Sequence, residues 1–130
     1  MTQEKIVRYW VETAEDNYAS MKRIFSAGEY VWALFIGHLV IEKLLKACCA
    51  RTLGKEVPKI HDLLRLAEKA GLETTPERRR ILDRLTAFQV NVRYPHQRYD
   101  LYKKATKEYT QRYIEEVAEL REWLLGILSE

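Results

Sequence analysis

Hydrophobic residues dominate the stretch from Tyr30 to Leu53, YVWALFIGHLVIEKLLKACCARTL. At about 100° per residue these apolar positions cover most of the circumference of a helix, which is typical of a buried helix. A strand is disfavoured because the run continues for twenty-four residues without proline and its second half is rich in Leu, Lys, Glu and Ala. We therefore predict a central helix over 30–53, roughly 36 Å long at about 1.5 Å per residue.

Four further helices are predicted from apolar residues that recur every three or four positions. The first begins after Thr2 as N-cap, and the short link through Gly28 makes it antiparallel to the central helix. Thr75 and Pro76 form an N-cap and N1 pair for the fourth helix, which cannot continue past Tyr94 because Pro95 follows. The predicted spans are 3–27, 61–71, 76–92 and 106–128.

Three polar residues interrupt the central helix at a spacing of four, namely His38, Glu42 and Lys46, with Lys43 to one side. This spacing places His38, Glu42 and Lys46 on one stripe of the helix. In one interpretation Glu42 pairs with Lys46 and His38 is a satisfied core or interface histidine. In the other, the stripe lines a polar pocket and Glu42 helps to orient a cationic or ligand-binding group.

The segment RYPHQRYDLYKKAT, residues 93–106, is expected to be irregular, and it is the densest cluster of functional side chains. Cations that bind phosphate next to rings that stack on bases are typical of nucleotide and nucleic-acid sites. Tyrosines in a loop also simply pack on a neighbouring helix, so both interpretations stay open. The cations are Arg93, His96, Arg98, Lys103 and Lys104, and the rings are Tyr94, Tyr99 and Tyr102.

The chain is long enough for one domain, 1–130, with one core. Its net charge of +3 conceals an asymmetry, because residues 78–112 carry ten basic and three acidic side chains and are therefore +7. Such an excess attracts phosphate-bearing ligands, although a solvated helix face is the commoner cause of a charge run.

Location and cofactor chemistry follow from the same composition. The charged start MTQEKIVRYW is unlike a signal peptide, and no apolar run approaches the roughly 20 residues of a membrane span, so we expect a cytoplasmic protein without a membrane. Cys48 and Cys49 are adjacent and read as core residues rather than as a disulfide. The three histidines and two cysteines have no metal-site spacing, and we expect no metal and no cofactor.

Two smaller features bear on binding. His61 stands at the start of the short helix, where it either caps the helix or binds a ligand, and Asp62 is expected in the first turn. The last helix carries large apolar residues beside its main seam, which suggests a second covered face and hence a homodimer. These residues are Ile114, Trp123, Leu125 and Leu128.

Three segments in this order resemble the HEPN domain family: YVWALFIGHLVIEKLLKACCA, KIHDLLRLAEKAGL and VRYP. The resemblance covers most of the chain. It implies an all-α bundle of about five helices, with a four-helix up-and-down core, that is frequently dimeric. It also implies nucleotide- or RNA-linked chemistry, often beside a small nucleotidyltransferase as a toxin–antitoxin pair. Carried over to this chain, it points to Glu42 and Lys43 and to Arg93, Tyr94 and Pro95.

The chain departs from the ribonucleases of that family. They carry an arginine, four to six residues and a histidine, whereas only two residues separate Arg93 from His96. In the ribonuclease scheme the histidine manages a proton and the arginine stabilises the phosphate, without a metal.

Our interpretation is a HEPN-like module that binds a nucleotide or RNA phosphate through Arg93. Lys43, His96 and nearby tyrosines assist, and the wider phosphate-binding set is Glu42, Lys43, Lys46, Arg93, Tyr94 and Arg98. Two alternatives remain, an endoribonuclease that uses Arg93 and His96 and a non-catalytic dimeric scaffold. The interpretation expects the polar residues of the central helix and Arg93 to converge on one solvent-reachable pocket.

Overall fold

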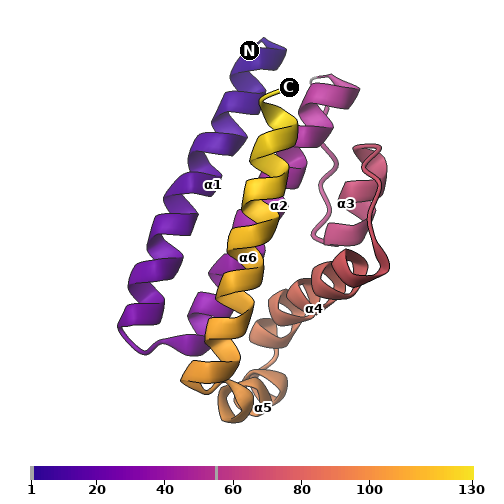
Figure 1. The fold of residues 1–130 in the computed structure, drawn as a ribbon. Coiled ribbons are helices and arrows are strands. Elements are labelled where there is room, and N and C mark those ends of the chain that lie inside the picture. Colours follow the sequence, from indigo (N-terminus) through magenta and orange to yellow (C-terminus); the bar gives the residue numbers. More distant parts are fainter. Residues whose placement is uncertain (1, 55) are drawn as a thin grey trace.

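The computed structural model describes residues 2–54 and 56–130, which form six helices and no strand. The expected all-α bundle is confirmed, with one helix more than predicted (Figure 1). The helices are α1 (Gln3–Ser26), α2 (Tyr30–Leu53), α3 (Leu63–Lys69), α4 (Pro76–Arg93), α5 (Pro95–Lys104) and α6 (Lys107–Leu128).

Helix α2 is the centre of the molecule, because it packs against each of the other five helices. Its second half, from Val40 to Ala50, is almost wholly buried, as the apolar pattern predicts. The pattern was wrong about Trp32, which remains 45% exposed near the start of the helix. Trp32 lines a hollow between α2 and α5, which leaves part of its ring uncovered.

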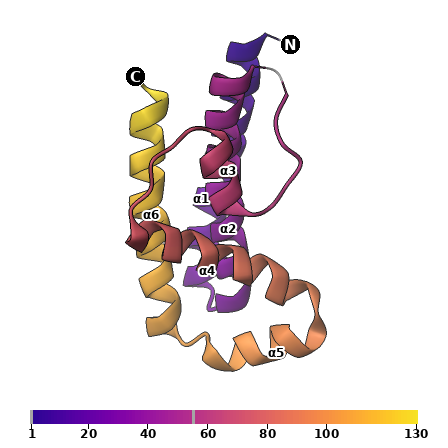
Figure 2. The same cartoon turned by 90° about the vertical axis from the view of Figure 1, so that its right-hand side faces the viewer.

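Three long helices run alongside one another, and α4 and α5 cross them near one end (Figures 1 and 2). Helix α1 is antiparallel to α2, since Gln3 at the start of α1 donates to carbonyls at the end of α2. Helix α6 runs parallel to α2, because Arg51 at the end of α2 donates to the carbonyl of Ile127 at the end of α6. Both chain ends therefore lie at the same end of the bundle (Figure 1).

The three long helices approach closely at Gly37 of α2. A Cβ atom at this position would lie 3.1 Å from Cγ2 of Val117 in α6 and 3.4 Å from Sδ of Met21 in α1. Glycine is therefore the residue that lets both neighbours pack directly on the backbone of α2.

Side chains cap four of the helices. Thr2, Asp62, Thr75 and Thr106 each accept a hydrogen bond from the backbone N–H three residues further on. These bonds satisfy N–H groups that have no partner within the helix. The prediction that Asp62 lies inside the first turn of α3 was wrong, because Asp62 is the N-cap and α3 begins at Leu63.

The expectation that residues 93–106 are irregular was also wrong, because residues 95–104 form α5. Pro95 holds Tyr94 in an extended conformation, with φ −110° and ψ 120°, and this ends α4. The same proline then occupies the first position of α5, where its missing N–H costs nothing. Leu101 and Ala105 are buried and anchor the short helix.

Cys48 and Cys49 are free and buried in the core, as expected. Burial raises the pKa of the Cys48 thiol to about 12. Among the described residues, no helix has the length and apolar character needed to cross a membrane.

Candidate functional site

The polar stripe of α2 is drawn together around Glu42, which is only 5% exposed. Its Oε2 atom lies 3.1 Å from Nζ of Lys46, one turn further along the helix. Its Oε1 atom lies 3.0 Å from Nδ1 of His61, which comes from the segment before α3. The ammonium of Lys46 also lies 5.4 Å from the ring centre of Trp10 in α1. Glu42 is thus engaged on both carboxylate oxygens.

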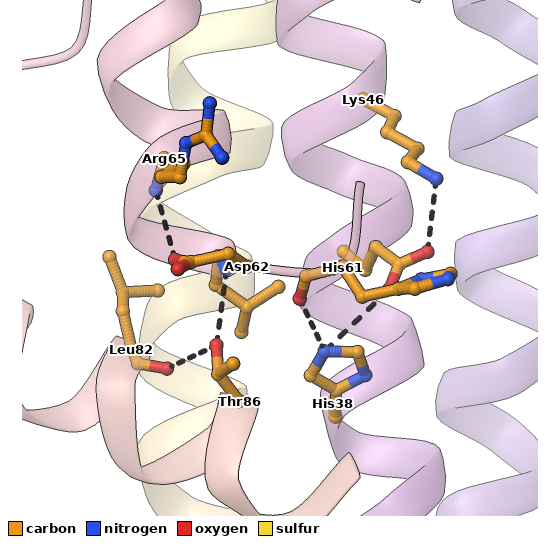
Figure 3. Close-up of polar contacts among 9 residues, drawn as sticks. His38, Lys46, His61, Asp62, Arg65, Leu82 and Thr86 are labelled. Carbon is orange, nitrogen blue, oxygen red and sulfur yellow. Dashed lines mark hydrogen bonds and ion pairs between the residues drawn. The ribbon is translucent and has the colours of Figure 1, made fainter. Parts of the chain in front are cut away.

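His38 completes this cluster from one turn earlier on α2 (Figure 3). The ring is fully buried, and its Nε2 lies 3.0 Å from the carbonyl oxygen of His61, to which it donates. Burial lowers the pKa of His38 below its ordinary value of 6.5, although the His61 carbonyl and the Glu42 carboxylate both act in the opposite direction. The neutral ring leaves Nδ1 as a buried acceptor that has no partner among the described residues.

The interpretation in which Glu42 pairs with Lys46 describes the observed ion pair, but His38 is satisfied only at Nε2, because its Nδ1 has no partner among the described residues. It did not anticipate His61, whose side chain is about half exposed and covers the carboxylate from outside. His61 neither caps α3 nor stands free, since Asp62 is the cap and Glu42 holds the imidazole. Lys43 is half-buried beside the stripe and makes no ion pair with a described residue.

Arg93, the main predicted phosphate-binding residue, lies on the last turn of α4 and is exposed. The buried amide of Gln89, with its oxygen turned toward the guanidinium, accepts from Nε at 2.9 Å and from Nη2 at 2.6 Å. Residues four apart lie on one helix face, so this contact braces Arg93 along α4. Sequence reasoning missed Gln89, although its spacing from Arg93 is a usable signal.

Three more predicted residues share this corner between α4 and α5. Tyr94 links the two helices and is 54% exposed, and His96 is exposed on the first turn of α5. Arg98 is half-buried, and its Nη1 donates to the carbonyl of Val92 at 3.0 Å. Arg98 therefore helps to hold α5 against the end of α4 while its other N–H groups stay available.

A cavity of about 480 Å³ opens beside this corner, between α5 and the N-terminal end of α2. Exposed aromatic rings line it, namely Trp32 of α2 and Tyr99 and Tyr102 of α5. Glu29 and Arg98 supply its charged side chains. Sequence reasoning named Tyr99 and Tyr102 but missed Trp32 and Glu29, because Trp32 sits inside a run that reads as core.

The predicted site residues thus form two groups, one around Glu42 and one around Arg93. Among the described residues, no hydrogen bond or ion pair joins a member of one group to a member of the other. The cavity beside Arg98 is lined by the first residues of α2, about 15–18 Å along the helix from Glu42 at about 1.5 Å per residue. Within the described ranges, no cluster of three His, Cys, Asp or Glu side chains is arranged to hold a metal ion.

Comparison with known proteins identifies the fold. A family model described as the HEPN domain matches residues 7–128, which is nearly the whole chain. No curated protein and no solved structure matches the chain. The match agrees with the three sequence segments and with the all-helical bundle, and the chain belongs to the HEPN domain family.

Proposed function

We propose that this chain is a nucleotide- or RNA-binding module whose phosphate-binding surface is the corner between α4 and α5. The braced guanidinium of Arg93 carries the proposal. Gln89 engages Nε and Nη2, so the remaining N–H groups of Arg93 face solvent in one orientation. A guanidinium held in this way has lost part of its rotamer entropy before the phosphate arrives.

Charge and neighbouring side chains support the same surface. Residues 78–112 have a net charge of +7, and this segment includes the whole corner. Tyr94 and His96 are exposed next to Arg93, which adds a ring and an imidazole to the cation. Among the described residues, no hydrogen bond or ion pair joins Glu42, Lys43 or Lys46 to this corner, so they are not part of the proposed phosphate surface. Phosphate contacts from Arg and Lys supply most of the sequence-independent affinity of such modules.

The first experiment measures binding and cleavage of a labelled single-stranded RNA by the purified chain in the presence of EDTA. We expect the chain to bind the RNA without cleaving it, and we expect Arg93→Ala to weaken RNA binding. Arg8→Ala is the matched control, because Arg8 is an exposed arginine on α1 and its loss changes the net charge equally. Equal weakening by both variants would contradict a site at Arg93.

A ribonuclease is the second candidate, and one observation favours it. Arg93 and His96 are both exposed on either side of the Tyr94–Pro95 break, although their spacing differs from the family motif. In that reaction His96 would move the proton and Arg93 would stabilise the phosphate charge. RNA cleavage in EDTA that is lost in both Arg93→Ala and His96→Ala would establish the enzyme over the module.

The proposed assembly is a homodimer beside a small nucleotidyltransferase, as in two-gene toxin–antitoxin systems. Membership in the family supports it. The extra apolar residues of α6 support a dimer less than expected, because they are half-buried against the core of their own chain. Trp123 is also covered by Arg78, whose guanidinium carbon lies 4.2 Å from its ring centre. Sedimentation that shows a monomer at tens of micromolar would remove the dimer from the proposal.

A pure scaffold is the remaining alternative. The engaged contacts of Glu42 are compatible with it, because they join α2 to Lys46 and to His61. This alternative expects Arg93→Ala to lower the melting temperature and to leave the affinity for ATP and RNA unchanged.

A further inference from the structure

Exposed aromatic rings are concentrated at one cavity of this molecule. Among the described residues, seven large hydrophobic side chains are exposed. Three of them, Trp32, Tyr99 and Tyr102, line the cavity of about 480 Å³ between α2 and α5. Their exposed fractions are 45%, 61% and 69%. Exposed rings are costly in water, and rings that gather in a hollow are typical of a binding site.

The shape and lining of the cavity favour a flat, aromatic ligand. Its volume lies within the range of roughly 300–1,000 Å³ that small-molecule sites occupy, which is more than a lone phosphate needs. Two of its tyrosines, Tyr99 and Tyr102, line it from α5 at a spacing of three, and Trp32 lines it from α2. Nucleic-acid bases stack on side chains of this kind.

The charged groups add the remaining chemistry of a nucleotide. Arg98 lines the cavity with N–H groups beyond the one that bonds to Val92. Lys103 lies 4.6 Å from the ring centre of Tyr99, so a second cation stands beside the rings. Glu29 places a carboxylate in the same lining, where it can accept from the amino or ring N–H groups of a base.

We propose that this cavity is the base-binding part of the site and that it takes the purine ring of a nucleotide between Trp32 and the α5 tyrosines. The inference rests on the proposed function, because the base would lie in the cavity while the phosphate surface at Arg93 binds the phosphate of the same ligand. A purine has the larger stacking area, and adenine and guanine each carry an amino group for Glu29. The site therefore binds AMP and GMP more tightly than UMP, and ribose 5-phosphate most weakly.

Isothermal titration of the full chain with AMP, GMP, UMP and ribose 5-phosphate tests the preference. Base stacking contributes about 1–3 kcal/mol per base, which corresponds to a loss of about fivefold to about 150-fold in affinity when the base is absent. Equal affinity for AMP and ribose 5-phosphate would overturn the inference, as would the absence of binding by all four compounds.

Two variants locate the binding. Trp32→Leu and Tyr102→Leu are each expected to weaken AMP binding at least fivefold without unfolding the chain, since both side chains are substantially exposed. Tyr9→Leu is the matched control, because Tyr9 is 50% exposed on α1 and does not line the cavity. Circular dichroism checks the fold of each variant. Retained AMP affinity in the folded Trp32→Leu variant would exclude this cavity.

The two proposals fail in distinguishable ways. Suppose that Arg93→Ala weakens RNA binding, while AMP either does not bind or binds the Trp32→Leu variant with unchanged affinity. The cavity inference then fails and the phosphate surface stands. If Trp32→Leu weakens AMP binding while Arg93→Ala changes no affinity, the cavity stands and the phosphate surface at Arg93 fails. Glu29→Gln tests the purine contact further, because it should reduce the preference for GMP over UMP.

Discussion

Glu42 and His61 meet at 3.0 Å between Oε1 and Nδ1, although they are nineteen positions apart in the chain. The carbonyl of the same histidine accepts from Nε2 of His38 at 3.0 Å. His61 therefore contacts α2 through both its side chain and its backbone carbonyl (Figure 3). The polar stripe of α2 thus anchors the segment that leads into α3.

Removal of the Glu42 charge should destabilise the fold strongly. In Glu42→Gln the ammonium of Lys46 stays in an environment where its side chain is only 9% exposed, and it loses its ion-pair partner. Breaking a buried pair on one side costs about 3–5 kcal/mol. Urea unfolding, followed by circular dichroism, measures the loss in free energy of unfolding.

The double variant Glu42→Leu/Lys46→Leu is the control for that loss. Because no buried charge remains, it should recover most of the stability lost in the single variant. A single variant that loses less than about 1 kcal/mol would show that the pair is effectively solvated.

Acidification should destabilise the protein through His38. Burial lowers the pKa of His38 in the folded state below 6.5, so the unfolded state takes up the proton first as pH falls. The stabilisation is full above the unfolded pKa and is lost as pH falls below about 6.5, until the folded pKa is reached. Urea unfolding between about pH 7.5 and pH 5.5 measures the slope, which is at most about 1.4 kcal/mol per pH unit for one proton.

His38→Gln separates this contribution from other groups that titrate in the same range. The groups that face His38 are Glu42 and Lys46 of α2 and His61 of the segment before α3. They remain in the variant, so a flatter pH dependence in His38→Gln isolates the buried imidazole. Identical slopes in the two proteins would assign the effect to the other groups.

Gln89 should act on binding through Arg93. In Gln89→Leu the Nε and Nη2 groups of Arg93 lose their acceptor. The buried position is then filled by an apolar side chain of similar size. We expect RNA affinity to fall severalfold and stability to change by no more than about 1 kcal/mol. Fluorescence anisotropy with a labelled RNA measures the affinity.

Gln111→Leu is the comparison for Gln89. Gln111 lies on α6, and among the described residues its amide donates only to Glu115, on the surface. Its substitution should leave affinity unchanged. If Gln89→Leu binds RNA as tightly as the parent chain, the brace has no part in recognition.

Local signals in the sequence predicted most of the fold. The span 30–53 coincides with α2, and Thr2, Thr75 and Thr106 are the caps that the sequence indicates. These features depend on periodicity and on capping chemistry, which are local. Helix α5 is hard to predict because Pro95 both ends one helix and begins another, and a proline after a helical pattern reads first as a stop.

The site was less predictable, because it depends on contacts between distant segments. The pairing of Glu42 with Lys46 follows from a spacing of four, but its contact with His61 depends on the path of the segment before α3. Trp32 reads as core in the sequence, and only the placement of α5 reveals that it lines a cavity with Tyr99 and Tyr102. Sequence pattern places a residue on a helix face, whereas tertiary packing decides what that face meets.

The most direct test of the account is the salt dependence of RNA affinity in Arg93→Ala, compared with Arg8→Ala. If Arg93 contacts a phosphate, its removal weakens binding at every salt concentration and lowers the slope of log K against log salt by about one. The account predicts this change for Arg93→Ala and no change for Arg8→Ala. An unchanged affinity and slope in a folded Arg93→Ala variant would contradict the account.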